Sequence, residues 1–359
     1  MEFDNLFNGM TVVDGHLHMH NFESKDGVLF IDGFERYRNK YGFKGLNIAS
    51  LPSGMRDVSN NIMCAFYKLA HEGTFAHAGL IYNKNPRDCE GMDPLTQYNE
   101  LMEIGFDGIK MLEGKPNLYK IINIPLCDDF YYDFFKACER DNTHILMHAV
   151  DPEEFWEEDK VDEETKQKGW FYGDGTHVSR EEIYSQVDAL LEKHPRLTLT
   201  LAHFFFCSKR PEKLVEMFEK HENLAVDITP GGEMFVSFNE DYEYFRAFFE
   251  RYSKRILFGT DGDSLPEWAR AMDWLAERLY KYIATDEATD SWSDHPLKGL
   301  NLPFENAQCI MGDNFLRRVG KEPRKINKEA LKAYIEKYKH LILDPKMLDN
   351  IEKMAKELL

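Results

Sequence analysis

The sequence predicts an α/β fold, a (β/α)8 TIM barrel with additional C-terminal helices. Short apolar segments recur along most of the chain, amphipathic helical segments separate most of them, and there are eight of the apolar segments. Apolar strands that alternate with helices indicate a parallel sheet covered on both faces. Eight repeats favour closure of that sheet into a barrel. A dinucleotide-binding fold lacks its main support, because no Gly-x-Gly-x-x-Gly follows the first segment.

The predicted strands come first, because they fix the order of the barrel. All are rich in Val, Ile, Leu and Phe, and they occupy residues 11–20, 43–50, 74–82, 106–112, 144–150, 197–204, 223–229 and 255–261. Between them, helical spacing of apolar residues is clear at 178–194 and 210–221.

Two segments depart from this regular alternation. Residues 151–177, after the fifth strand, form a longer connection than is usual, with a run of carboxylates and aromatic residues toward both ends. This pattern favours a lid over an active site, although a solvated acidic loop has the same composition. The tail at 291–359 shows helical patterns and no further strand, so its helices should pack outside the barrel. No linker or repeat divides the chain, and we expect 1–359 to form a single domain.

Composition narrows the classes of partner. The 359-residue chain has a formal net charge of −19, and a field of that sign repels nucleic acid and anionic membrane surfaces. No segment is long and apolar enough to cross a bilayer, and the first residues lack a targeting pattern, so we expect a cytoplasmic protein. The six cysteines are scattered without a Cys-x-x-Cys pair, as expected of reduced thiols. The expected partner is a small molecule, and a homo-oligomer stays open.

The first predicted strand, TVVDGHLHMH, places histidines at alternate positions. Side chains two residues apart in a strand project from one face, so His16 and His18 can direct two imidazoles to one point. Two buried imidazoles without a shared partner would each cost desolvation free energy, which favours a metal site for the pair. His20 should project from the same face of the strand, but it lies two residues beyond His18. It is therefore a weaker candidate for a ligand or a substrate contact.

Three more candidate ligands fall near the carboxyl ends of later strands: His148 in strand five, His203 in strand six and Asp261 in strand eight. Active sites of such barrels lie at this end, and imidazoles with a carboxylate suit a catalytic divalent metal such as zinc. A single histidine at a strand end is more often structural, and Asp261 could instead cap the following helix. The combination is therefore more specific than any of its members. The histidines expected to be structural are His71, His77 and His144.

The pattern of these residues resembles that of the amidohydrolase superfamily, in particular of its amidohydrolase-related branch of metal-dependent hydrolases and decarboxylases. His-x-His in strand one, His148, His203 and FGTD ending in Asp261 carry the resemblance, together with LPFENAQCIMGDNFLRR after the barrel. The likeness covers nearly the whole chain. It implies that His16, His18 and His148 are metal ligands. It also implies that Asp261 is a ligand and the general base, whereas His203 binds the metal or polarises the substrate.

The expected cofactor is one divalent metal ion. Zinc fits the donor set best, and manganese, iron and nickel are the alternatives. Lys110, expected late in strand four, has three open roles: a carbamylated bridge to a second metal as in binuclear relatives, an ammonium that binds a substrate carboxylate, or a structural ion pair. A second metal is expected only if Lys110 is carbamylated. Lys115 is a weaker candidate for anion binding.

Further candidate contacts lie in the loops after strands five, six and seven. These loops should shape the substrate pocket, although for the last two plain loop packing is an equal alternative. The candidate substrate-binding residues are Lys110, Trp170, Tyr172, Phe204 and Glu233.

This set permits metal-assisted hydrolysis, in which a divalent ion lowers the pKa of water from about 15.7 toward 7 and Asp261 moves the proton. We therefore expect a hydrolase that cleaves a C–N or C–O bond in an amide, lactone or cyclic ester. A non-oxidative decarboxylase or hydratase of the same branch is the alternative. Some decarboxylating relatives have an acidic residue where His16 stands, which gives a mild preference for hydrolysis. A non-catalytic binding barrel is the third hypothesis.

Overall fold

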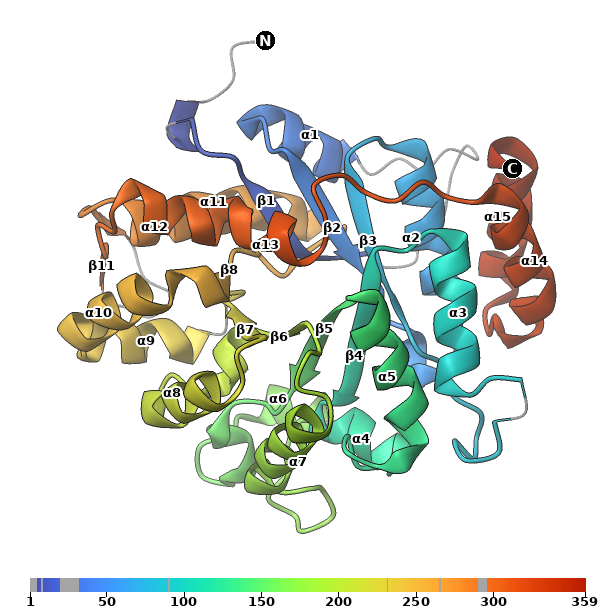
Figure 1. The fold of residues 1–359 in the computed structure, drawn as a ribbon, viewed down its shortest axis with the longest axis horizontal. Helices are drawn as coiled ribbons and strands as arrows, with labels where there is room; N and C mark the ends of the chain where they lie inside the picture. Colours follow the sequence, from blue (N-terminus) through green and yellow to red (C-terminus); the bar gives the residue numbers. More distant parts are fainter. Residues whose placement is uncertain are drawn as a thin grey trace.

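The computed structural model describes residues 5–7, 9–19, 32–89, 91–230, 232–264, 266–289 and 296–359. Strands in its centre are surrounded by helices, in the order expected for alternating strand and helix (Figure 1). Within the described residues, no helix combines the length and the apolar character that crossing a bilayer requires.

The central sheet is parallel, and its strands follow one another around the barrel in chain order. Nearly all of its strand residues are buried, as expected for a sheet that is covered on its outer face and filled inside. The strands are β1 (Val13–His18), β2 (Gly45–Ala49), β3 (Thr74–Gly79), β4 (Gly108–Gly114), β5 (His144–Ala149), β6 (Leu199–Leu201), β7 (Leu224–Asp227), β8 (Ile256–Leu257) and β9 (Gly262–Asp263).

The eighth strand closes the barrel, although it is divided into two short pieces. Its first piece, β8, pairs with β7, and its second piece, β9, pairs with β1. Between the pieces, the amide of Asp261 donates to the carbonyl of His16 (2.9 Å). A single stretch of chain therefore bridges the last and first strands, which confirms the predicted (β/α)8 barrel.

The helices lie around the strands, and several of them begin at a residue whose side chain caps the first turn. Ser179 caps the helix predicted at 178–194, because its side chain accepts from the amide of Glu182 (3.2 Å). The helices are α1 (Asp32–Tyr41), α2 (Ser59–Ala70), α3 (Pro94–Ile104), α4 (Pro116–Ile122), α5 (Tyr132–Asp141), α6 (Glu163–Gln167), α7 (Arg180–Lys193), α8 (Pro211–Lys220), α9 (Gly232–Glu240), α10 (Tyr242–Tyr252), α11 (Pro266–Ala284), α12 (Phe304–Gln308), α13 (Asn314–Arg318), α14 (Lys328–Tyr338) and α15 (Pro345–Leu358).

The C-terminal helices lie outside the barrel: α15 lies against α2, and α14 lies against α3 (Figure 1). The expectation that the tail holds no further strand is wrong. A short antiparallel ribbon joins β10 (Ala288–Thr289) to β11 (Leu297–Lys298). The run predicted as strand six at 197–204 is also too long, because the chain leaves β6 after Leu201 and enters a tight 3-10 turn.

A row of buried polar side chains crosses the barrel interior below its mouth. Asn47 donates to the carbonyl of Gly15, so its Oδ1 must accept from His77 Nδ1 (2.7 Å). His77 Nε2 then accepts from His144 Nδ1 (2.8 Å), and His144 Nε2 accepts from the hydroxyl of Thr200 (2.8 Å). Burial lowers the pKa of His77 to about 3. Burial also holds the pKa of His144 well below its usual range, so both imidazoles are neutral structural groups, in agreement with the sequence prediction.

This row requires a glycine at position 108. A Cβ atom on Gly108 would lie 2.3 Å from His77 Nε2 and 2.5 Å from the carbonyl oxygen of His144. Only a residue without a side chain lets the two imidazoles meet at this point of β4.

Glu113 carries a buried carboxyl group outside the cavity described below. Glu113 in β4 accepts a hydrogen bond from the hydroxyl of Tyr82 (2.5 Å), which also lies 3.3 Å from the hydroxyl of Tyr131. In the described part of the chain, its second oxygen has no partner. Burial raises the pKa of Glu113 from 4.5 to about 7.

Glu113 should make the barrel less stable as the pH rises. The folded chain keeps this proton up to pH of about 7, whereas the unfolded chain releases it near 4.5, so the free energy of unfolding falls between these values. Glu113→Gln removes this titration, so the difference between variant and wild type should grow by up to about 3 kcal/mol across that window. Urea unfolding at pH 4.5, 6 and 8 measures it. Parallel pH profiles of the two proteins would contradict the assignment.

Candidate metal and catalytic site

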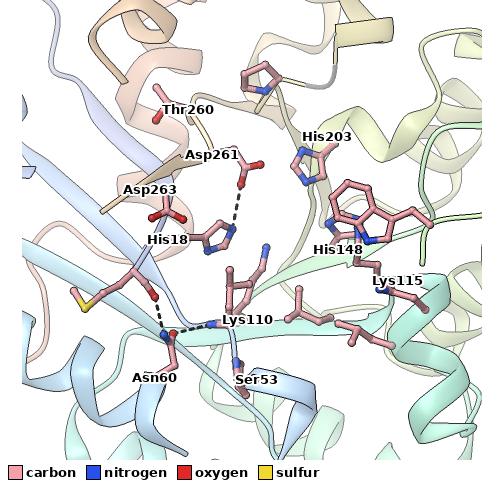
Figure 2. Close-up of a pocket in the computed structure, with 18 of the residues that line it drawn as sticks. His18, Ser53, Asn60, Lys110, Lys115, His148, His203, Thr260, Asp261 and Asp263 are labelled. Carbon is pink, nitrogen blue, oxygen red and sulfur yellow. Dashed lines mark hydrogen bonds and ion pairs between the residues drawn. The ribbon is translucent and has the colours of Figure 1, made fainter. Parts of the chain in front are cut away.

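A cavity of about 1040 Å³ opens at the carboxyl ends of the strands. Figure 2 shows His18 and Asp261 on one side of it, His148 and His203 on the other, and Lys110 between them. The walls are largely apolar, with Trp170 from segment 151–177. The polar side chains that line it are His18, Ser53, Asn60, Lys110, Lys115, Asn117, His148, His203, Thr260, Asp261 and Asp263.

Three of the predicted ligands form a close group: donor atoms of His16, His18 and Asp261 all lie within 4.8 Å of one another. The two Nε2 atoms of His16 and His18 are 3.1 Å apart, and Asp261 Oδ1 is 3.1 Å from His18 Nε2 and 3.6 Å from His16 Nε2. The histidines come from β1, and the backbone pairing across the barrel closure brings Asp261 to them.

The other ring nitrogens fix the tautomers of the two histidines. His16 Nδ1 donates to Asp227 Oδ2 (2.8 Å), and His18 Nδ1 donates to the carbonyl of Ala49 (2.8 Å). In the neutral rings, each Nε2 atom therefore carries a lone pair, and the two lone pairs face each other and a carboxylate oxygen. Such a group of electron-rich atoms requires a cation, and carboxylate- or carbonyl-held imidazoles are the usual ligands of a divalent metal. The residues fit a metal site.

The charges of these groups follow from their burial and their neighbours. Burial and the nearby ammonium of Lys110 lower the pKa of His16 to about 3, so this imidazole is neutral. Burial alone would raise the pKa of Asp227, but the facing His16 lowers it to about 2. Burial likewise acts against ionisation of Asp261, yet the neighbouring imidazoles of His18 and His203 hold its pKa well below the usual range. Asp261 is therefore an ionised base.

Lys110 lies at the centre of the site, not late in its strand as expected, because it is the third residue of β4. Its Nζ donates to His16 Nε2 (2.8 Å), and its side chain is 1% exposed. Burial lowers its pKa to about 8. Lys110 Nζ thus lies beside the close group, and the three predicted roles of this residue stay open.

His148 and His203 lie at the same mouth but outside the close group. The rings of His203 and His16 are 5.7 Å apart between centroids, and those of His203 and His148 are 4.8 Å apart. His148 Nε2 lies 2.8 Å from Asp151 Oδ1. The role of these two histidines as ligands stays a prediction.

The hydrogen bonds of His203 indicate which nitrogen is available. The hydroxyl of Thr229 donates to Asp227 (2.6 Å), so it accepts from His203 Nδ1 (2.9 Å). In the neutral form of the His203 ring, the lone pair is therefore on Nε2. A lone pair favours the role of a ligand over that of a donor that polarises the substrate.

Segment 151–177 folds back on itself beside the cavity. Trp170 lines the cavity, stacks on Phe155 with 6.1 Å between ring centroids, and has the Nζ of Lys115 4.9 Å above its ring. Tyr172 is buried and donates to Asp151 (2.6 Å) instead of lining the cavity. Its prediction as a direct substrate contact is therefore wrong in this conformation.

Phe204 is also misplaced by the sequence prediction. It is fully buried among the rings of α9 and α10, with Phe238 4.9 Å and Phe248 5.4 Å away between ring centroids. Phe206 lies near the site instead, 5.3 Å from the ring of His203. The side chain of Glu233 and the whole of His20 lie outside the described residues.

Several residues at the site escaped the sequence analysis. Asp227 ends β7 and holds His16, Asp151 follows β5 and holds His148, and Asp263 and Trp274 line the cavity. A carboxylate at the carboxyl end of β7 was a usable signal, because that end of every barrel strand faces the active site. Nothing in the sequence pairs Asp227 with His16.

The comparisons with known proteins agree with this geometry. The family model described as amidohydrolase matches residues 93–317, which is more than half of the chain. The chain belongs to the amidohydrolase family. Members of this family typically depend on a divalent metal, and the donor group at the barrel mouth is suited to one.

Solved structures show the same fold at low sequence identity. An uncharacterised TIM-barrel protein of Bordetella bronchiseptica is 12% identical with a TM-score of 0.53, over 87% of this chain and 99% of the other. A probable 2-pyrone-4,6-dicarboxylic acid hydrolase of Acinetobacter baumannii is 11% identical with a TM-score of 0.52, over 86% and 99%. A 2,6-dihydroxybenzoate decarboxylase gives 13% and 0.50, over 87% and 98%. A search of curated protein sequences finds no match.

The contact between His16 and Asp227 should set metal affinity in this amidohydrolase. Asp227→Asn can place an amide donor opposite His16 Nδ1 and so remove the lone pair from Nε2. We expect the zinc affinity to fall about 10- to 100-fold, measured by competition with a chromophoric chelator. Asp188→Asn is the matched control, because Asp188 bonds His221 Nε2 (2.6 Å) between α7 and α8. Equal zinc affinities of Asp227→Asn and wild type would rule out this role.

Proposed function

We propose that this amidohydrolase is a metal-dependent hydrolase that cleaves a C–N or C–O bond, in an amide, lactone or cyclic ester, in a small molecule. The observation that carries the proposal is the close group of His16, His18 and Asp261, in which an ionised carboxylate faces two imidazole lone pairs inside a cavity. His148 and His203 are the further ligands that the sequence predicts, and both line the same cavity.

A divalent ion held by these donors, zinc in the first place, supplies positive charge that makes water acidic near neutral pH and stabilises an oxyanion. Asp261 accepts the proton of the attacking water at its carboxylate and passes it to the leaving group. Its ionised state supports this role, because a base must be free of its proton before the reaction. Trp170 of segment 151–177 forms part of the cavity wall and fills space there that water would otherwise occupy.

The cavity walls support a substrate with both an apolar and an anionic part. Trp170, Trp274 and Leu112 offer apolar surface, while Lys110 and Lys115 bring two ammonium groups to the same space. These ammonium groups also favour the second candidate, non-oxidative decarboxylation, because a carboxylate that is to be lost must first be bound. In either reaction the partner is a small molecule.

Asp261→Asn should remove turnover and retain much of the metal. The amide cannot accept the proton of water, and loss of a general base costs about 10²- to 10⁴-fold in kcat. A screen of lactones, amides and aromatic carboxylates, with assays for acid release and for carbon dioxide, measures the activity and separates the two candidates. Asp188→Asn serves again as the control. Full activity of Asp261→Asn would remove its role as the base.

Elemental analysis should find about one tightly held divalent ion per chain, and a chelator should abolish turnover until a divalent metal is restored. His16→Ala should lose the ion, because it removes a donor and leaves Asp227 Oδ2 without the imidazole that bonds it. A chain that turns over its substrate in the chelator, without any bound ion, would refute the metal-dependent hydrolase.

A further inference from the structure

Asp151 joins three parts of the molecule at one buried carboxylate. Its Oδ1 accepts from Lys115 Nζ (2.9 Å), which follows β4, and from His148 Nε2 (2.8 Å) in β5. Its Oδ2 accepts from the hydroxyl of Tyr172 (2.6 Å), near the far end of segment 151–177. Asp151 is 2% exposed, so these donors replace water as its partners.

The contact with Asp151 fixes the tautomer of His148. An ionised carboxylate only accepts hydrogen bonds, so His148 Nε2 bears the proton and the lone pair of the neutral ring is on Nδ1. Val150 lies between the two residues with φ of +70°, which a β-branched residue rarely adopts. This turn brings Asp151 back against the ring three positions before it.

Tyr172 transmits the same contact to segment 151–177. Its ring is buried against Trp156 (4.9 Å) and His177 (5.0 Å), and its amide donates to the carbonyl of Phe155 (2.7 Å). The hydroxyl of Tyr172 therefore ties the far end of the segment to its first residue, Asp151. Trp170, two residues earlier, is the part of the segment that lines the cavity.

We propose that Asp151 is a positioning residue that couples the docking of segment 151–177 to the orientation of the His148 imidazole, through the hydroxyl of Tyr172. When the segment is docked, Tyr172 holds the carboxylate and the carboxylate holds the ring. When the segment lifts, Asp151 loses one of its three donors, and His148 loses its fixed orientation. Closure of the segment thus completes the site. This inference deepens the proposed function, on which its catalytic consequence rests, but the coupling itself is independent of the reaction.

Tyr172→Phe tests the coupling from the side of the segment. Removing a hydrogen bond to a charged group should make tryptic cleavage at Lys160, Lys166 and Lys168 about tenfold faster, because cleavage follows the population of the undocked segment. The same variant should weaken zinc affinity, although Tyr172 lies outside the close group. The control is Tyr98→Phe, whose buried hydroxyl donates to Asp141 (2.9 Å) and bonds Thr143, away from the site. Faster cleavage with unchanged zinc affinity would overturn the proposal.

His148→Leu tests the coupling from the other side and needs no catalytic assay. Because coupling is reciprocal, this variant should also speed cleavage of the segment, to which Asp151 connects His148. The double variant should be cleaved more slowly than the product of the two single increases predicts. If His148→Leu fails to fold, Asp151→Asn takes its place in this double-mutant cycle with Tyr172→Phe. Independent effects, or no effect of the substitution at 148 or 151, would refute the coupling even in a chain that proves to be a hydrolase.

Discussion

The backbone contact between the first and last strands is the constraint on which the site depends. The amide of Asp261 donates to the carbonyl of His16, and the amide of Ser264 donates to that of His18 (3.2 Å). These bonds close the barrel and, at the same residues, bring the carboxylate to the two imidazoles. Asp261 has φ of +54° and lies between the two pieces of the eighth strand. The residue with this strained backbone is thus the one whose side chain belongs to the site. Folding and assembly of the donor group are thus one event.

The barrel could be predicted because its signal repeats. Each buried strand is a continuous apolar run, and the runs that match β2, β3, β5 and β7 differ from the structure only at their ends. The eighth strand could not be predicted in detail, since its pairing switches from β7 to β1 within a few residues and depends on both neighbours. The ribbon of β10 and β11 is too short for any period to appear in its sequence.

At the site, the sequence predicts which residues meet but not how each ring is held. The parity of β1 places His16 beside His18, and the carboxyl ends of the strands gather the other candidates at one mouth. Partners such as Asp227 and Asp151 come from other strands or from a backbone turn, and no local pattern marks them. Phe204 was misplaced because a run of three phenylalanines does not indicate which ring faces the helices.

The polar row from Asn47 to Thr200 affects proton transfer through the barrel interior. All its hydrogen bonds run in one direction and end at the side-chain amide of Asn47, which does not ionise and so does not pass a proton on. His77 in this row is flanked by Lys68 and Lys110, whose charges both lower its pKa. The row is therefore an uncharged partition across the barrel. The imidazole of His77 thus stays uncharged between the ammonium of Lys110 at the site and that of Lys68, which pairs with Asp107.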